Sequence, residues 1–200
     1  MAGHIASSKS NDWVTPQDIV DLVRSFYADL GHLPPAESID LDPCSNPKSL
    51  VNARTNFLLP QNDGLKEDWV NFENIYVNPP YGRGELLPWC EKMYQSATYS
   101  NILALLPAKV GTRAFQYIFN SADAICFIKS RVTFDGAEQG APMDCCFVFW
   151  SKACVDDAEY HHRMKLFHQY FSSKGNIVWL QYGPEGVSLG NLSVYGLQNE

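Results

Sequence analysis

Asn74-Ile-Tyr-Val-Asn-Pro-Pro-Tyr81 sets a run of strand-forming residues directly against two prolines. Ile75, Tyr76 and Val77 are typical of a buried β-strand. Proline has no backbone N–H to donate to a neighbouring strand, so the pair at 79–80 stops the ladder of hydrogen bonds. The sequence therefore predicts a strand over residues 74–78 that ends abruptly at the proline pair.

Strand-like and helix-like segments alternate on the C-terminal side of this strand. Helices are expected over residues 85–99, 112–121 and 156–171, strands over 102–106, 124–129 and 176–182, and a late antiparallel hairpin with arms 131–134 and 144–150. Such alternation is typical of an α/β fold with a mostly parallel sheet.

The N-terminal side supplies one more helix and one more strand. Thr15 is a candidate N-cap for a helix over residues 16–30, and a short strand over 38–42 follows. Only 36 residues separate Asp42 from Asn78, too few for two βα units, so we expect the sheet to be abridged at one edge. No repeat or Gly/Ser linker interrupts the chain, and we expect one domain over residues 1–200 with a loose start over 1–10.

The charge of the chain is unevenly spread. The 15 basic and 22 acidic residues give a net charge of −7, which argues against nonspecific nucleic-acid binding by the whole surface. Residues 74–134 hold six basic and three acidic residues, so this window is +3 and the rest of the chain is −10. The window is either a surface that faces an anion or an ordinary solvated face.

Composition and cysteine spacing argue against several classes of protein. The chain has no run of 18 apolar residues, and its polar start lacks the apolar segment of a signal peptide. Its six cysteines form no Cys-x-x-Cys pair and no metal-ligand spacing, which favours buried thiols over a disulfide framework. We therefore expect a cytoplasmic protein with no membrane segment and no metal.

Asn78-Pro79-Pro80-Tyr81 is the most informative motif in the chain. A string of Asn, Asp or Ser, two prolines and an aromatic residue arises by chance in roughly 1% of chains of this length. It follows the predicted buried strand, at the carboxyl edge where α/β sheets bind ligands. The alternative is a rigid turn that ends the strand and exposes an aromatic ring.

The residue types in this motif suit the activation of an amino group. An exocyclic amine on a nucleobase is a weak nucleophile because its lone pair is delocalised into the ring, and acceptors on its two N–H bonds favour the pyramidal form. The side-chain oxygen of Asn78 and the backbone carbonyl of Pro79 can be those acceptors. Tyr81 can stack on a base that has turned out of its helix. We therefore expect the catalytic residues to be Asn78, Pro79, Pro80 and Tyr81.

The motif and its neighbours resemble the phage-type Dam family of DNA N6-adenine methyltransferases. The resembling segments run in order through about the first 150 residues: Trp13–Pro16, Asp40–Ser45, Asp63–Leu65 with Trp69, Asn78–Tyr81, Leu105–Pro107 and Arg131–Phe134. The resemblance implies an abridged Rossmann-like fold, S-adenosylmethionine as the cofactor and methyl donor, and DNA as the partner. For a phage-encoded protein it implies the cytoplasm of the bacterial host.

The resemblance also implies where the cofactor binds. Thr15 and Pro16 are implied to lie against the methionine carboxylate, Asp42 at the ammonium or the ribose, and Asp63 and Leu65 near the adenine ring. The cofactor-binding residues implied are Trp13, Thr15, Pro16, Asp42, Pro43, Cys44, Asp63 and Leu65. The loop after Asp42 lacks the glycines of the Asp-x-Phe-x-Gly-x-Gly loop that methyltransferases usually have. Simpler roles stay open, with Thr15 as a helix cap, Asp42 as a turn residue and Asp63-Gly64 as a turn.

A second group of residues is expected to bind the substrate. Phe134 is a candidate for the wall of the base pocket opposite Tyr81, or else a core strand residue. Arg131 and Arg83 are candidate phosphate contacts, and Lys109 a candidate for the lining of the cleft. The chain leaves no room for a separate target-recognition domain, so loops over residues 82–87 and 135–143 are expected to read the DNA sequence.

The motif leaves the acceptor open. Cytosine N4, guanine N2 in RNA and a glutamine side chain in a protein are all amino groups that Asn-Pro-Pro-Tyr can hold. A catalytically idle binding module of the same fold is a further alternative, although the intact motif argues against it. The sequence carries no indication of the oligomeric state.

Overall fold

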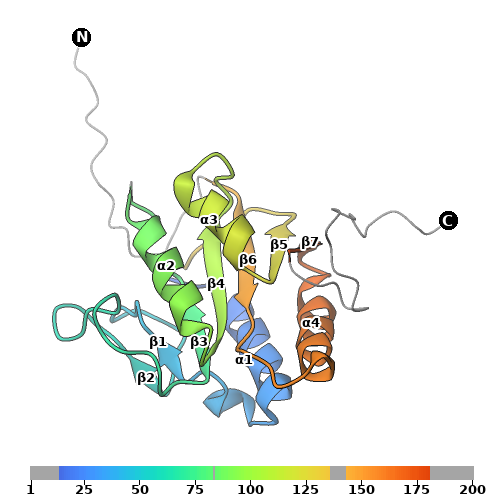
Figure 1. Cartoon of the computed structure of the whole chain (residues 1–200). Coiled ribbons are helices and arrows are strands. Elements are labelled where there is room, and N and C mark those ends of the chain that lie inside the picture. The colour runs from blue at the N-terminus through green and yellow to red at the C-terminus, as the bar shows by residue number, and fades with distance from the viewer. Residues whose placement is uncertain (1–13, 83, 136–142, 181–200) are drawn as a thin grey trace.

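The computed structural model describes residues 14–82, 84–135 and 143–180, and within them the chain forms a mixed α/β fold (Figure 1). The α-helices described are α1 (Gln17–Gly31), α2 (Leu86–Ser96), α3 (Arg113–Ser121) and α4 (Asp157–Phe171), with a short 3-10 helix, η1, at Pro35–Glu37. The strands described are β1 (Leu41–Asp42), β2 (Thr55–Asn56), β3 (Asn74–Val77), β4 (Asn101–Pro107), β5 (Ala124–Ile128), β6 (Cys145–Trp150) and β7 (Gly175–Trp179).

The seven described strands form one sheet in the order β2-β1-β3-β4-β6-β5-β7. Strands β1 to β5 run in one direction, because β1, β2, β3 and β4 pair in parallel and β4 and β5 are each antiparallel to β6. Strand β7 is antiparallel to β5. The carboxyl ends of β1 to β5 therefore meet at one edge of the sheet, called the carboxyl edge below, and β4 points towards it at the top of Figure 1.

The antiparallel hairpin predicted from residues 131–134 and 144–150 forms with β5 in place of residues 131–134. Residues 131–134 form no strand, and β6 pairs instead with β5 on one side and β4 on the other. Both sides of β6 are occupied, by β4 and β5, so residues 131–134 have no free side of β6 to pair with. These residues cross to the N-terminal segment, where the Asp135 backbone N–H donates to the Val14 carbonyl (3.0 Å).

The first helix also begins and ends differently from the prediction. Pro16 is the N-cap, and the Pro16 carbonyl accepts from the backbone N–H of Ile19 (3.1 Å). Thr15 makes no cap, because its hydroxyl turns away from the helix towards β3. The short spacing between Asp42 and Asn78 is reflected in the sheet, since residues 43–73 contain the two-residue strand β2 and no α-helix.

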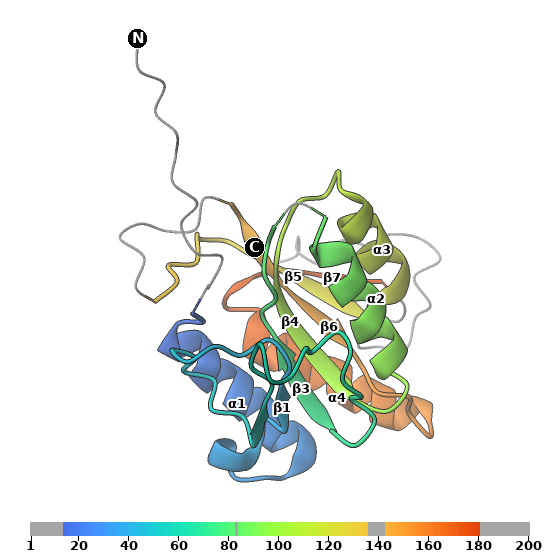
Figure 2. The same ribbon diagram turned by 90° about the vertical axis from the view of Figure 1, so that its left-hand side faces the viewer.

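Helices cover both faces of the sheet. Figure 2 shows α2 and α3 on one side and α1 on the other, and α4 packs on the face that α1 covers. Strand β4 alternates between the two cores: Leu103 and Leu105 face α1 and α4, whereas Ile102, Ala104 and Leu106 face α2 and α3. A strand that is buried on both faces needs apolar residues at nearly every position. The continuous apolar run of β4 therefore predicts this strand from the sequence.

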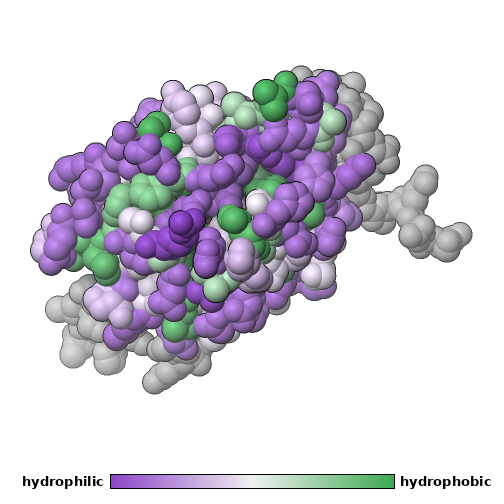
Figure 3. Space-filling model, turned by 90° about the horizontal axis from the view of Figure 1, so that it is seen from below, coloured by the Kyte–Doolittle hydropathy of each residue, from purple (hydrophilic) through white to green (hydrophobic). Residues whose placement is uncertain are grey.

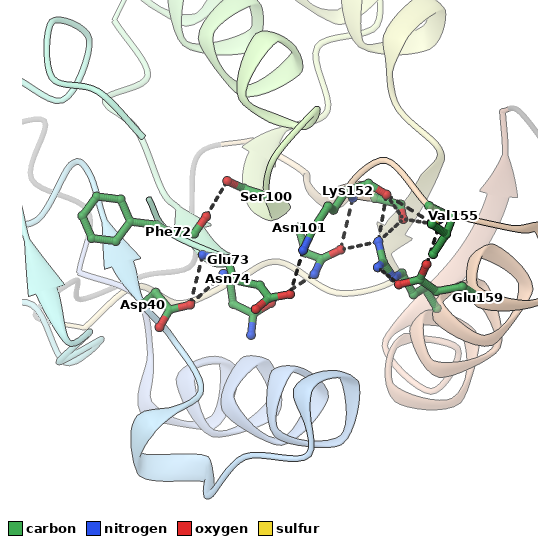
Figure 4. Close-up of polar contacts among 12 residues, drawn as sticks. Asp40, Phe72, Glu73, Asn74, Ser100, Asn101, Lys152, Val155 and Glu159 are labelled. Atoms are coloured by element: carbon green, nitrogen blue, oxygen red, sulfur yellow. Dashed lines mark hydrogen bonds and ion pairs between the residues drawn. The ribbon is translucent and has the colours of Figure 1, made fainter. Parts of the chain in front are cut away.

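A polar network joins the elements at the opposite, amino edge of the sheet (Figure 4). The Asp40 carboxylate accepts from the backbone N–H groups of Glu73 and Asn74 (3.2 and 2.9 Å). The Asn101 side-chain oxygen accepts from the guanidinium of Arg163 (3.1 Å), a residue that is only 6% exposed and also pairs with Glu159. These contacts fasten β1, β3, β4 and α4 together.

The face seen from below Figure 1 is mostly hydrophilic, with separate apolar patches (Figure 3). No helix among the described residues has the length and apolar character needed to cross a membrane.

Candidate active site

Asn78 follows the last residue of β3, and its side-chain amide is held at both ends. Its Nδ2 donates to the Thr15 hydroxyl oxygen (3.1 Å), and its Oδ1 accepts from the Tyr81 hydroxyl (2.7 Å). The buried strand and the two prolines fix the backbone on either side of this amide. Asn78 therefore stands at the carboxyl edge with its acceptor oxygen in a defined orientation.

Tyr81 lies deeper than a ring exposed by a turn, at 9% exposure. Its hydroxyl is also 2.9 Å from the Leu105 carbonyl, and burial raises its pKa well above the usual value, so the hydroxyl stays protonated. The ring packs edge-to-face on Phe134, with centroids 6.2 Å apart. Phe134 is buried too, in a loop rather than a strand, and its ring contacts Tyr81 directly; its role as a wall of a base pocket stays a prediction. Stacking of a base on Tyr81 stays a prediction.

A pocket of about 340 Å³ adjoins Asn78 at the carboxyl edge. It brings together residues from the loops after β1, β2 and β3, among them the predicted Pro43, Cys44, Asp63, Asn78 and Pro80. Residues that sequence reasoning missed also line it, including Phe57, Leu58, Asn62 and Trp89. Phe57 directly follows the two-residue strand β2, which is too short to leave a readable pattern.

Asp42 supports this pocket from behind. It is 4% exposed and is not among the residues that line the pocket. Its carboxylate accepts from the Cys44 backbone N–H and the Ser49 hydroxyl, both at 3.2 Å, and so holds the loop that forms one wall. Burial raises the pKa of Asp42 to about 6, although hydrogen bonds from Cys44, Ser45 and Ser49 oppose the shift.

Asp63 is both a turn residue and a pocket residue. Its carboxylate accepts from the Leu65 backbone N–H (3.1 Å) and pairs with Lys66 (2.9 Å). The hydrogen bond from Lys66 is the main cause of a lowered pKa at Asp63. Leu65 does not line the pocket, and packs instead against the core beneath α2 and α3.

Comparison with known protein families identifies the chain. The family model described as DNA N-6-adenine-methyltransferase (Dam) matches residues 3–156, about three quarters of the sequence. The chain belongs to the Dam family. Among curated proteins, no sequence matches it. The family assignment selects adenine N6 in DNA from the amino acceptors that the motif left open, and the chain is a DNA N6-adenine methyltransferase.

The matched region of this Dam-family enzyme includes the N-terminal residues expected near the cofactor. Thr15 is 3% exposed and bonds to Asn78 and to the Tyr76 hydroxyl (3.2 Å). Pro16 is half-buried at the start of α1, and neither residue lines the pocket. Trp13 and Arg83 lie outside the described residues, as do positions 136–142 of the expected sequence-reading loop.

Basic residues of the Dam-family enzyme gather at the carboxyl edge. Lys109 and Arg113 follow β4, Lys129 and Arg131 follow β5, and all four side chains are exposed. These residues account for four of the six cations in the +3 window. Two exposed acidic residues, Asp135 and Asp144, lie nearby in the chain. The positive window is thus concentrated at the edge that carries Asn78.

The cysteines form no disulfide, and one of them belongs to this site. All six cysteines are free, and Cys44, the one that lines the pocket, has its pKa raised well above the usual value by burial. In the part of the chain that the structure describes, no group of three or more His, Cys, Asp or Glu side chains is arranged to hold a metal ion.

Proposed function

We propose that this DNA N6-adenine methyltransferase uses S-adenosylmethionine as its methyl donor, bound in the pocket beside Asn78. The observation that supports this most directly is that Asn78, of the catalytic motif, also lines the pocket. A volume of about 340 Å³ falls within the range of small-molecule sites, roughly 300–1,000 Å³. A methyl donor in this pocket would lie next to the group that holds the amine.

The lining suits the chemistry of the cofactor. Phe57 and Leu58 offer apolar surface for an adenine ring, whereas Ser45, Asn62 and Asp63 offer polar groups for its amine and hydroxyl groups. Bound S-adenosylmethionine would supply an electrophilic methyl group on a sulfonium. Asp42 would contribute by bracing the loop of Pro43 and Cys44, and its carboxylate lies close behind that wall.

The catalytic motif would hold the acceptor. Asn78 Oδ1 and the Pro79 carbonyl would each accept a hydrogen bond from one N–H group of adenine N6, so that the nitrogen lone pair points out of the ring plane. Both acceptors are fixed before the base arrives, by two proline φ angles and by the bonds at Asn78. The base would have to leave the double helix to reach them, and Tyr81 with Phe134 would form the wall of its pocket.

Incubation of the protein with labelled S-adenosylmethionine and duplex DNA tests this function. Nucleoside analysis of the digested DNA is expected to place all label in N6-methyldeoxyadenosine, and a duplex without adenine is the control. Label in cytosine, or equal labelling of RNA or protein, would contradict the proposal. Calorimetry with S-adenosylmethionine alone tests the pocket separately from the transfer.

DNA would dock on the basic carboxyl edge. We propose Lys109 and Arg131 as phosphate contacts, because both are exposed and follow the carboxyl ends of β4 and β5. Arg83, beside the motif in the sequence, is a third candidate. The chain outside residues 74–134 carries a net charge of −10, so binding should be selective for this edge and steeply salt-dependent.

Replacing Lys109 or Arg131 by alanine should weaken binding to all DNA sequences alike. Each lost phosphate contact should reduce the log–log slope of affinity against salt by about 0.9. The measurement is fluorescence anisotropy of a labelled duplex across a salt series. Lys165→Ala, on the exposed side of α4, is the matched control and should keep the parent slope. Unchanged slopes in both test variants would place the DNA-facing surface elsewhere.

A further inference from the structure

We propose that Thr15 and Tyr76 are positioning residues that fix the orientation of the Asn78 amide. This inference rests on the proposed role of Asn78 Oδ1 as an acceptor for adenine N6. It assigns Thr15 a role other than cofactor contact, and it gives Tyr76, which the motifs leave unassigned, a part in the reaction.

The three residues form a chain of side-chain hydrogen bonds. The Tyr76 and Thr15 hydroxyls are 3.2 Å apart, and Asn78 Nδ2 donates to the Thr15 hydroxyl oxygen at 3.1 Å. Tyr76 and Asn78 are two residues apart on one extended segment, so their side chains leave the same face of it. Thr15 reaches them from the segment before α1, 63 residues away from Asn78 in the sequence.

These contacts lie in a sealed environment. Tyr76 is 1% exposed and Thr15 is 3% exposed, so water does not compete readily for their hydroxyls. Burial also raises the pKa of Tyr76, which keeps its hydroxyl protonated. On the other side of the amide, the Tyr81 hydroxyl donates to Asn78 Oδ1 and has the Leu105 carbonyl as a second acceptor (2.9 Å).

The orientation of the amide matters because its two ends have opposite hydrogen-bonding character. The last side-chain torsion of asparagine has broad, roughly two-fold preferences, so the oxygen and the nitrogen exchange places easily when nothing holds them. A reversed amide would present N–H groups to the N–H groups of the substrate amine. With its Nδ2 held by Thr15, Asn78 keeps the oxygen as the acceptor.

Tyr76 helps Thr15 to act as an acceptor. The Thr15 hydroxyl has one proton, and when that proton points to the Tyr76 oxygen the lone pairs of Thr15 are left for Asn78 Nδ2. Without the Tyr76 hydroxyl, the Thr15 proton would be able to turn to Asn78 Oδ1 and stabilise the reversed amide. Removing either hydroxyl should therefore slow methyl transfer and leave the affinity for S-adenosylmethionine unchanged.

Thr15→Val, which keeps the shape and removes the hydroxyl, is the main test, with Tyr76→Phe as a second variant. Single-turnover methylation at saturating S-adenosylmethionine and DNA should be slowed about tenfold, the effect of losing one well-placed hydrogen bond. The calorimetric Kd for S-adenosylmethionine should stay within about twofold of the parent value. Thr15→Ser should restore the rate, and thermal melting checks that each variant folds.

Combination with Asn78→Ala shows whether the effect passes through Asn78. Residues that act through one group are not additive, so Thr15→Val should cause no further slowing in the Asn78→Ala background. If Thr15→Val weakened cofactor binding and left the methylation rate at saturating S-adenosylmethionine unchanged, the proposal would be overturned and Thr15 would be a cofactor ligand. Additive losses, or an unchanged rate in both variants, would also overturn it. Parent protein that fails to bind S-adenosylmethionine would instead contradict the proposed function.

Discussion

Asn78→Ala is expected to slow methyl transfer by about a hundredfold while S-adenosylmethionine affinity stays within about twofold. A preorganised acceptor that acts on the reacting group typically contributes on the order of 3 kcal/mol to the transition state. We propose Asn78 Oδ1 as such a group; it accepts from the Tyr81 hydroxyl at 2.7 Å, and Thr15 holds the Nδ2 end of the amide. Single-turnover methylation measures the rate of methyl transfer, and calorimetry measures the affinity for S-adenosylmethionine.

Asn120→Ala is the matched control for this variant. Asn120 is an exposed asparagine on α3, and its side chain donates to the Gln116 carbonyl of the same helix. Its loss should change neither the rate nor the cofactor affinity. A rate for Asn78→Ala close to that of the parent would show that the amide oxygen does not hold the substrate amine.

Asp42→Ala should have the opposite effect: it should weaken cofactor binding more than it slows methyl transfer. Asp42 fastens the loop after β1 through the Cys44 N–H and the Ser49 hydroxyl, so its loss should loosen one wall of the pocket. We expect weaker S-adenosylmethionine binding by calorimetry, with much of the transfer rate recovered at saturating cofactor. Equal loss of cofactor affinity in Asn78→Ala and Asp42→Ala would contradict the separation of the two roles.

The parts of the fold that the sequence predicts well are those that local pattern determines. Strands β4 and β6 are buried on both faces and stand out as apolar runs. Strands β1 and β2 have two residues each, and so leave almost no pattern. The strand expected over 131–134 does not form for another reason. Its alternating residues suit a strand, but its expected partner, β6, already pairs with β4 on one side and β5 on the other.

The same distinction applies to the site. Asn78 to Tyr81 is one contiguous motif, so its catalytic role could be proposed without knowing the fold. The contact between Thr15 and Asn78 spans 63 residues, and no local pattern indicates it. Thr15 before a proline suggests a helix cap, yet Pro16 is itself the N-cap, which leaves the Thr15 hydroxyl for β3 and Asn78. Phe57 was missed because the strand before it is too short to recognise.

Gly64→Ala is expected to weaken S-adenosylmethionine binding by about tenfold and to lower the free energy of unfolding by about 1–3 kcal/mol, the usual cost of overpacking. A Cβ at Gly64 would lie 1.9 Å from the Pro43 carbonyl oxygen and 3.0 Å from the Trp89 ring. Pro43 and Trp89 both line the pocket, and Asp63 precedes the glycine. The backbone of one wall must therefore shift, which changes the shape of the site.

Gly111→Ala separates this effect from the general effect of replacing a glycine. Gly111 lies in the exposed loop between β4 and α3, and a Cβ there would meet nothing within 4 Å. This control should keep the parent cofactor affinity, with stability changed by at most about 0.5 kcal/mol. Calorimetry and chemical denaturation measure both quantities on the same preparations. Because Gly64 is part of the pocket wall and lies outside the Asn78–Tyr81 motif, its variant should regain most of the parent transfer rate at saturating cofactor. Parent-like cofactor affinity in Gly64→Ala would mean that S-adenosylmethionine does not bind between the loops after β1 and β2.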